Sequence, residues 1–364
     1  PQQRAVKNKD GVLLQDDREI RRRWTEYCSN LYNNTETHER SQEVMKDLEK
    51  ISPAADERNQ PLLKDEVHKA IGKLKKHKSP GSDGIVGEII QAGGDALEEE
   101  IFSIMKSIWE EETIPEEWTK SIIVTIPKKG DLRECSNYRT ISLINHLGKV
   151  LLNIILDRLE ANVNPHLSEE QAGFRKDRST VQQILILRLM AEKSWRKDKR
   201  IFNCFIDFQK AFDTIKHDMI WNVLNSFGVD IKITRLLQNI YANSKAAVQV
   251  GRELGDWFGQ SIGTRQGDPV SPAIFITYLE WVMDACEDCR TGVNISGELI
   301  DNLRFADDID LLEERSEDLQ ESLNGVAAAA EPMGLRLNIA KTKVMVFGEE
   351  QMTERVTIGN TEID

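Results

Sequence analysis

The stretch "LRFADDIDLL", Leu303 to Leu312, places three carboxylates inside an apolar run. Asp307 and Asp308 are adjacent, and Asp310 follows two residues later. Burying a carboxylate without compensation costs several kcal/mol, so few folds tolerate this arrangement. The segment therefore predicts either a strand end that faces water or a site that binds a cation.

A second carboxylate follows another apolar strand. In "FIDFQKAFD", Phe205 to Asp213, the side chain of Asp207 comes at the end of the run "IFNCFIDF". If this strand lies beside the hairpin predicted for "LRFADDIDLL", Asp207 and Asp307 converge on one spot. Two Mg²⁺ ions about 3.5–4 Å apart would neutralise such a cluster and support phosphoryl transfer. A solvated acidic turn fits the same residues equally well.

A third segment, "GTRQGDPVSP" from Gly263 to Pro272, combines a glycine with prolines at a helix start. Gly267 leaves the backbone accessible to whatever binds there. The spacing alone is also that of an ordinary helix N-terminus.

The remaining periodicities predict a mixture of helices and strands. Helices are expected at residues 18–34, 62–78, 97–109, 145–159, 218–227, 231–243, 271–289 and 317–333. Strands are expected at 121–127 and 201–208, with hairpins around 251–255 and 306–308 and a strand pair in 335–348. The polar stretch 38–60 is predicted to be a loop. The absence of regular βαβ alternation favours an α+β fold with a palm-like sheet backed by helices.

Composition narrows the class of protein. The net charge of −13 over 364 residues is unfavourable for binding nucleic acid. From Lys120 to Ile215, however, 17 Lys/Arg stand against 11 Asp/Glu, a local charge of +6.

Five scattered cysteines favour a reducing compartment, and "CEDC" is interpreted as two helical thiols and not as a zinc site. Without a secretory signal or membrane span, an intracellular protein, nuclear or cytoplasmic, is expected.

Read together, the segments resemble the reverse transcriptases of non-LTR (LINE-type) retrotransposons. The family's motifs match, in order, "IPKKGDLRECSNYRTISL", "EEQAGFRKDRST", "FIDFQKAFD", "TRQGDPVSP", "FADD" and "GLRLNIAKTK". The resemblance extends from the N-terminal helix to nearly the last residue. It implies an RNA-directed DNA polymerase that adds dNTPs to the 3′-hydroxyl of a DNA primer on an RNA template.

The resemblance also implies a two-metal site. Asp207, Asp307 and Asp308 would be catalytic. Two Mg²⁺ ions, or Mn²⁺ in their place, would be bound by Asp207, Asp307 and the backbone of Phe208. Lys341 would be the general acid for the departing pyrophosphate, with Lys343 as a competitor. A solvated surface charge is the alternative for both lysines.

Further residues are assigned by the same resemblance to substrate and nucleic acid. Those assigned to the incoming nucleotide are Lys128, Lys129, Arg139, Phe212, Gln266 and Gly267. Phe212 matches the aromatic residue that excludes a ribose 2′-hydroxyl, although it is equally an ordinary core Phe. Backbone contacts to template or primer, which position a duplex without reading its sequence, are implied for Lys75, Lys76, Lys78, Arg175 and Arg178.

The implied fold is the fingers and palm of a right-handed polymerase, with an antiparallel palm sheet backed by helices and the thumb largely absent. Residues 1–60 would form an N-terminal helical extension and linker, 61–200 the fingers and 201–364 the palm. Fingers and palm would interleave, and the chain would stop before the primer grip and thumb. The chain departs from the family at Asp177, where Gly is common at a tight turn.

Two alternatives stay open. The chain could be an inactive or repurposed retroelement fragment that binds nucleic acid or protein. It could also be a group II intron-type maturase or another cellular reverse transcriptase with the same metal chemistry. The sequence does not specify an oligomeric state.

Overall fold

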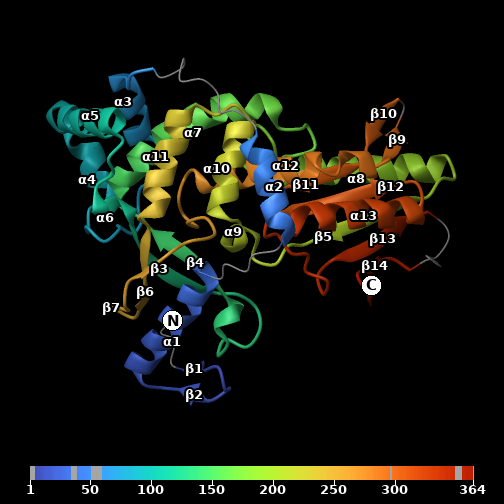
Figure 1. Ribbon diagram of the computed structural model, residues 1–364, viewed down its shortest axis with the longest axis horizontal. Helices are drawn as coiled ribbons and strands as arrows, with labels where there is room; N and C mark the ends of the chain where they lie inside the picture. The colour runs from blue at the N-terminus through green and yellow to red at the C-terminus, as the bar shows by residue number, and fades with distance from the viewer. Residues whose placement is uncertain (1–4, 34–38, 51–59, 296, 349–354, 364) are drawn as a thin grey trace. The chain divides into compact units, whose positions relative to one another are not determined.

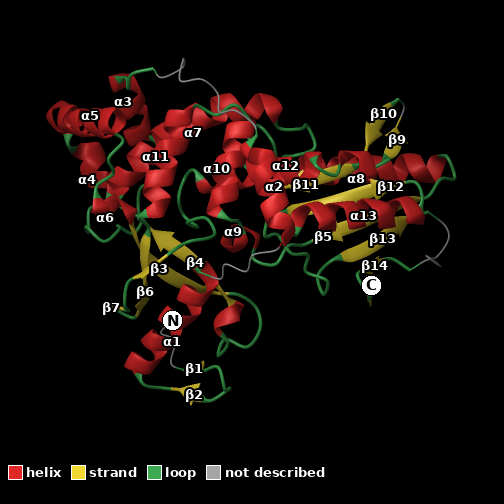
Figure 2. Cartoon of the chain, viewed as in Figure 1, coloured by secondary structure: helices red, strands yellow, loops and turns green. Residues whose placement is uncertain are grey.

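The computed structural model describes residues 5–33, 39–50, 60–295, 297–348 and 355–363, and it is a mixed α/β structure (Figures 1 and 2). Its contacts divide the chain into two compact units. Unit 1 comprises the described parts of Pro1–Glu36, Ile51–Asn162 and Phe212–Ser271. Unit 2 comprises those of Thr37–Lys50, Val163–Ala211 and Pro272–Asp364.

Unit 1 is built on a sheet in which strands distant in sequence are neighbours. The strand order is β4 (Tyr138–Leu143), β3 (Lys120–Pro127), β6 (Lys245–Val250) and β7 (Glu253–Leu254), with β8 (Phe258–Gly259) also pairing β6. Helix α1 (Asp17–Tyr32) begins where the Asp16 side chain accepts hydrogen bonds from two free backbone N–H groups. Its buried face, with Trp24 fully buried, packs against β6 and β8.

Most of the other helices of unit 1 lie to one side of this sheet, above it in the view of Figure 2. They are α3 (Lys64–Gly72), α4 (Gly87–Ala92), α5 (Gly94–Glu111), α6 (Glu116–Thr119), α7 (His146–Val163), α9 (Ala211–Thr214), α10 (His217–Ser226) and α11 (Ile231–Ala242), the first residue of α9 and the last of α7 being counted with unit 2. A short pair, β1 (Val6–Lys7) with β2 (Leu13–Leu14), and the 3-10 turn Cys135–Asn137 complete the unit.

Unit 2 contains a four-stranded antiparallel sheet. Its order is β11 (Asn302–Phe305), β12 (Asp308–Glu313), β5 (Ile201–Ile206) and β13 (Lys343–Phe347). Helix α13 (Ser316–Ala330) lies along β12 and β5, while α8 (Thr180–Arg196) contacts β11 and β13 (Figure 1). The unit also holds the helices α2 (Glu39–Glu49) and α12 (Ser271–Asp284), the first residue of α12 being counted with unit 1. It further holds the strand pairs β9 (Val293–Ile295) with β10 (Glu298–Ile300) and β14 (Thr357–Ile358) with β15 (Thr361–Glu362), and 3-10 turns at Asn164–His166 and Glu287–Cys289.

The mixture of helices and sheets and both predicted hairpins are confirmed. Other predictions of local structure are wrong. Residues 39–49 form α2 and not a loop, and the helix expected over 62–78 already ends at Gly72. Residues 335–348 supply one strand, β13, and not a pair. Helix α8 and strand β4 were not predicted at all.

Candidate active site

The sheet of unit 2 brings Asp207 beside Asp308. Strand β5 ends at Ile206, which pairs with Ile309 in antiparallel register. One position further along both chains, Asp207 lies opposite Asp308, and residues directly opposite each other point to the same face of a sheet. The expectation that the Asp207 strand lies beside the "FADD" hairpin is therefore confirmed.

Asp307 lies in the tight turn of this hairpin. Phe305 pairs with Asp308, so Ala306 and Asp307 alone connect β11 to β12. Ala306 has a φ of 58°, a conformation that residues with a side chain rarely adopt. The Asp307 side chain is half-buried. Two of the three carboxylates thus face each other across strands, and the third occupies the turn that precedes one of them.

Lys341 contacts the carboxylate of Asp207. Its Nζ lies 3.1 Å from Oδ2 and 3.2 Å from Oδ1. Asn338 donates through Nδ2 to Asp207 Oδ1 at 3.1 Å, and its backbone N–H donates to the Asp207 carbonyl at 2.7 Å. This backbone bond fixes the segment that carries Lys341. The competitor, Lys343, opens β13 opposite Phe205.

The electrostatics of this face are those of a crowded acidic site. Burial, and then the neighbouring charge of Asp207, raise the pKa of Asp308, while Lys341 acts in the opposite direction. A cleft of about 680 Å³ is lined by Asp207, Asp308, Asp310 and Lys341. Repulsion between the facing carboxylates is relieved in part by the lysine ammonium, and a bound cation would relieve it further.

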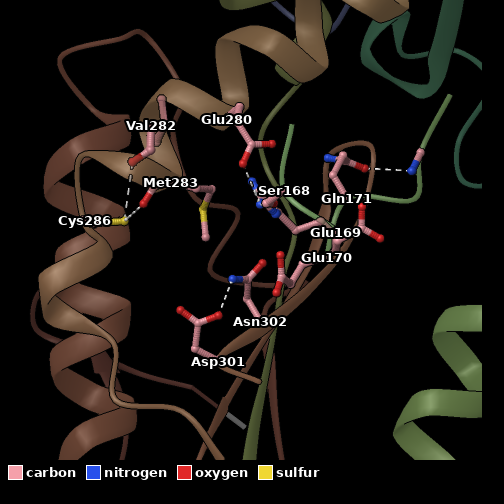
Figure 3. Close-up of polar contacts among 12 residues, drawn as sticks. Ser168, Glu169, Glu170, Gln171, Glu280, Val282, Met283, Cys286, Asp301 and Asn302 are labelled. Atoms are coloured by element: carbon pink, nitrogen blue, oxygen red, sulfur yellow. Dashed lines mark hydrogen bonds and ion pairs between the residues drawn. The ribbon is translucent and has the colours of Figure 1, made fainter. Parts of the chain in front are cut away.

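The donor chemistry of these carboxylates fits Mg²⁺. Carboxylate oxygens are its usual protein ligands, and substrate phosphates normally supply others. In the part of the chain that the structure describes, no three His, Cys, Asp or Glu side chains are gathered closely enough to hold a metal by themselves. In "CEDC", Cys286 is buried, and its Sγ contacts the carbonyl oxygens of Val282 and Met283 at 3.4 and 3.3 Å (Figure 3).

In unit 1, hydrogen bonds join Phe212 and the residue after it to the segment around Gln266. The Phe212 carbonyl accepts hydrogen bonds from Thr264, through N at 2.7 Å and Oγ1 at 3.2 Å. The next residue, Asp213, is buried, and its Oδ1 accepts from Gln266 Nε2 at 2.9 Å and from the Tyr32 hydroxyl at 3.2 Å. Two predicted substrate residues are thus brought together.

Gly267 lies against strand β4, which carries Arg139. The Gln266 carbonyl accepts from Ser142 N at 2.6 Å, and a Cβ on Gly267 would come within 2.6 Å of the Ser142 carbonyl oxygen. Arg139 is exposed three residues earlier in β4, roughly 10 Å along the strand. Lys128 and Lys129 are exposed just after β3, where Lys128 N donates to the Asn137 carbonyl.

The residues predicted to contact nucleic acid fall into two groups. Lys75, Lys76 and Lys78 are exposed in the turn after α3. In unit 2, Arg175 Nη1 donates to the Gln171 carbonyl at 3.2 Å and also to that of Ser168, and Arg178 Nη1 donates to the Glu169 carbonyl at 3.0 Å. Both arginines thus donate hydrogen bonds to backbone carbonyls of the loop that precedes them. Their contact with a nucleic-acid duplex stays a prediction.

Several residues of these sites were missed by reasoning from the sequence. Asn338 and Asp213 lie inside the segments singled out for the resemblance, but no role was given to either. Tyr32 lies more than 90 residues before the first of these segments, and its hydroxyl also contacts Thr140 Oγ1 at 2.8 Å. A buried Asp next to Phe212 was the available signal, whereas nothing local to Tyr32 marks it.

None of the helices within the described ranges is both long and apolar enough to traverse a bilayer.

Comparison with known proteins assigns the chain to a family. A family model for the reverse transcriptase (RNA-dependent DNA polymerase) matches residues 126–361. The chain is 26% identical to the Pol polyprotein of the type-1 retrotransposable element R2 of Nasonia vitripennis, over 83% of this chain and 30% of that polyprotein. It is 30% identical to the R2 polyprotein of Popillia japonica, over 78% of this chain and 39% of the relative.

A further relative is the transposon TX1 149 kDa protein of Xenopus laevis, which is 23% identical over 93% of this chain and 26% of its own length. The chain thus spans about a third of the length of these relatives. The match to the family model, the similarity to retrotransposon proteins and the paired carboxylates lead to the same assignment. The chain belongs to the reverse transcriptase (RNA-dependent DNA polymerase) family, in its non-LTR retrotransposon group.

Proposed function

We propose that the chain catalyses RNA-directed DNA synthesis, with unit 2 as the palm and the sheet of unit 1 as part of the fingers. One observation carries the proposal. The register of β5 with β12 sets Asp207 opposite Asp308, with Asp307 in the adjoining turn and Lys341 on Asp207. Such a carboxylate group is what nucleotidyl transfer requires.

Under this proposal Asp207, Asp307 and the Phe208 carbonyl hold two Mg²⁺ ions. The ions would supply Lewis acidity toward the primer hydroxyl and the leaving pyrophosphate. Asp308 adds negative charge beside Asp207, and Lys341 would donate a proton to the leaving pyrophosphate. Its ammonium lies 3.1 Å from Asp207 Oδ2, and Lys341 is one of the residues that line the cleft.

The substrate residues of unit 1 take the incoming dNTP in this proposal. Lys128, Lys129 and Arg139 would bind the triphosphate, for which a planar guanidinium and point charges are suited. Phe212 would exclude a 2′-hydroxyl. Its carbonyl accepts hydrogen bonds from Thr264, and the side chain of its neighbour Asp213 accepts one from Gln266, so the backbone that carries the ring is held in place.

Primer extension with Mg²⁺ on oligo(dT)-primed poly(rA) tests the proposal. Wild type should extend the primer, and Asp207→Asn and Asp307→Asn should each lose most of that activity. Asp256→Asn is the matched control, because Asp256 is exposed and lies outside the site. Folded wild-type protein that does not extend the primer would favour the alternative, an inactive or repurposed retroelement protein.

The leaving-group role of Lys341 needs a separate comparison. Lys341→Arg keeps the charge on Asp207 but is a much weaker acid, so kcat should fall while Mg²⁺ dependence stays near that of wild type. An unchanged kcat in Lys341→Arg would assign Lys341 to charge compensation only.

A further inference from the structure

A short segment, Ser168 to Gly173, extends the sheet of unit 2 beyond the hairpin that carries Asp307 and Asp308. Ala172 N donates to the Arg304 carbonyl at 2.9 Å, and Arg304 N donates to the Glu170 carbonyl at 3.0 Å. Gln171 thereby forms a parallel bridge with Arg304 of β11. Figure 3 shows Ser168, Glu169, Glu170 and Gln171 following one another along this segment.

The Gln171 side chain binds both backbone groups of Ala306, the first residue of the turn. Its Oε1 accepts from Ala306 N at 3.0 Å and from Gly173 N at 2.7 Å. Its Nε2 donates to the Ala306 carbonyl at 3.3 Å. The amide is fully buried, so these three bonds are made away from competing water.

The peptide that Gln171 binds is strained. Ala306 has a left-handed φ of 58°, which is unfavourable for a residue with a Cβ and persists only where its surroundings enforce it. Gly173 allows the close approach, because a Cβ there would lie 2.1 Å from Ala306 N. Asp307 follows Ala306 directly, so the orientation of the Ala306 peptide sets where Asp307 points.

The segment itself is anchored. Arg304 forms a buried ion pair with Glu280, at 2.9 Å between Nη2 and Oε1, and also contacts the Ser168 hydroxyl. Glu280 and Ser168 lie next to each other in Figure 3. Arg175 donates to the carbonyls of Ser168 and Gln171. These contacts hold the segment that carries the Gln171 amide in place.

We propose that Gln171 is a positioning residue that holds the Ala306 peptide so that Asp307 and Asp308 present their carboxylates for metal binding. The proposal rests on the proposed polymerase function. An ordinary buried amide would contribute only to stability. A positioning amide also sets the metal affinity and kcat, because a shift of about 1 Å at a reacting centre can cost roughly 100-fold in rate.

Gln171→Met tests this, since it keeps the length and removes all three bonds. The matched control is Gln320→Met, because Gln320 of α13 also binds both backbone groups of one residue. Its Oε1 accepts from Thr357 N at 2.7 Å, and its Nε2 donates to the Thr357 carbonyl at 2.9 Å. Two readouts are compared: kcat in primer extension, and Mn²⁺ affinity of the protein alone by electron paramagnetic resonance.

Gln171→Met should lower kcat roughly 10- to 100-fold and weaken Mn²⁺ binding, with KM for dNTP little changed. Gln320→Met should change neither readout. If both variants behave alike, or if Gln171→Met alters only KM, the positioning role is overturned while the polymerase proposal survives. If wild type neither extends the primer nor binds Mn²⁺, the proposed function fails and this inference fails with it.

Should Gln171→Met not fold, the same substitution is made together with Ala306→Gly. Glycine adopts a φ of 58° without strain, so folding is expected to return. Positioning predicts that kcat and Mn²⁺ affinity stay low in the folded double variant. Recovery of both to the values of Ala306→Gly alone would show that Gln171 only offsets strain, and would overturn the proposal.

Discussion

Asp310 lies in β12 with 5% of its surface exposed, and neither carboxylate oxygen has a hydrogen-bond partner among the described residues. Burial raises its pKa to about 8. Asp310→Leu should therefore stabilise the protein, by about 1–3 kcal/mol, because it removes an unsatisfied buried polar group and adds apolar surface. Urea denaturation near neutral pH measures this.

The same exchange at an exposed position, Asp256→Leu, should change stability by less than about 0.5 kcal/mol. A loss of stability in Asp310→Leu would mean that the carboxyl makes a favourable contact in the folded protein. Within the described ranges its oxygens make no such hydrogen bond.

His217 introduces a pH dependence in unit 1. Its Nε2 donates to the Gly263 carbonyl at 2.8 Å, and its ring packs edge-on against Tyr241. Burial lowers its pKa; the Gly263 bond and Asp218 oppose this shift, and Arg265 adds to it. The folded state thus binds this proton less readily than the unfolded state, whose His has a pKa of about 6.5.

Stability from His217 is therefore complete above the unfolded pKa and is lost as pH falls through that value toward the lower folded pKa. The melting temperature of wild type should fall between about pH 7 and about pH 5.5, and His217→Gln, which can still donate to Gly263, should flatten that slope. Equal slopes for the two proteins, measured by differential scanning fluorimetry, would contradict this assignment.

Among the elements, the loop Gly263 to Gly267 depends on its close contact with β4. Gly267 has a φ of 113°, and a methyl group added to it would lie only 2.6 Å from the Ser142 carbonyl oxygen. Gly267→Ala should destabilise the protein by about 2–3 kcal/mol and raise KM for dNTP, since Gln266 is displaced with the loop.

Gly259→Ala is the matched control, because an added methyl there meets nothing within 4 Å. Denaturation and primer-extension kinetics of the two variants provide the comparison. An unchanged KM in a folded Gly267→Ala protein would separate this loop from nucleotide binding.

The elements that sequence reasoning missed share a physical cause. Helix α8 exposes Val181, Ile184 and Leu185, so its apolar residues do not mark a single buried face. Helix α2 buries little beyond Ser41 and Leu48, and its polar sequence resembles a loop. In contrast, α1 buries Ile20, Trp24, Cys28 and Tyr32 at regular four-residue spacing, and it was predicted correctly.

Some features of the candidate site could likewise be predicted from the sequence, and others could not. The hairpin and the strand end that carry Asp207, Asp307 and Asp308 could be predicted, because they are local patterns of apolar and acidic residues. The register in which these strands pair could not be predicted. The same holds for the contacts of Asn338, Tyr32 and Gln171 with residues of the site, since those contacts join segments separated by more than 100 residues. Asp177, where the family usually has Gly, has a φ of 60°, which explains that preference for Gly.

At the scale of the whole molecule, each unit has a hydrophobic cluster of its own among the described residues. One core joins α1, β3 and β6 around Trp24, and the other joins α8, β5 and β12 around Leu312. Trp24→Ala should cost about 3–5 kcal/mol through the cavity it leaves. Hydrogen exchange should then accelerate in β3 and β6 and less in β5 and β13.

Leu312→Ala should give the reverse pattern, with faster exchange in β5, β11 and β13 than in β3 and β6. Trp195→Ala is the surface control, because 71% of Trp195 is exposed. Uniform acceleration across both units in either core variant would mean that they open as one cooperative body.

The order of strands in unit 2 has a consequence for how the protein is made. Strand β5 is central in its sheet, yet both of its neighbours, β12 and β13, are encoded about a hundred or more residues later. At translation rates of about 5–20 residues per second, "IFNCFIDF" leaves the ribosome several seconds before any partner strand exists. During that interval an apolar strand with two open edges is a target for self-association, so nascent chains should depend on chaperones until β13 has emerged.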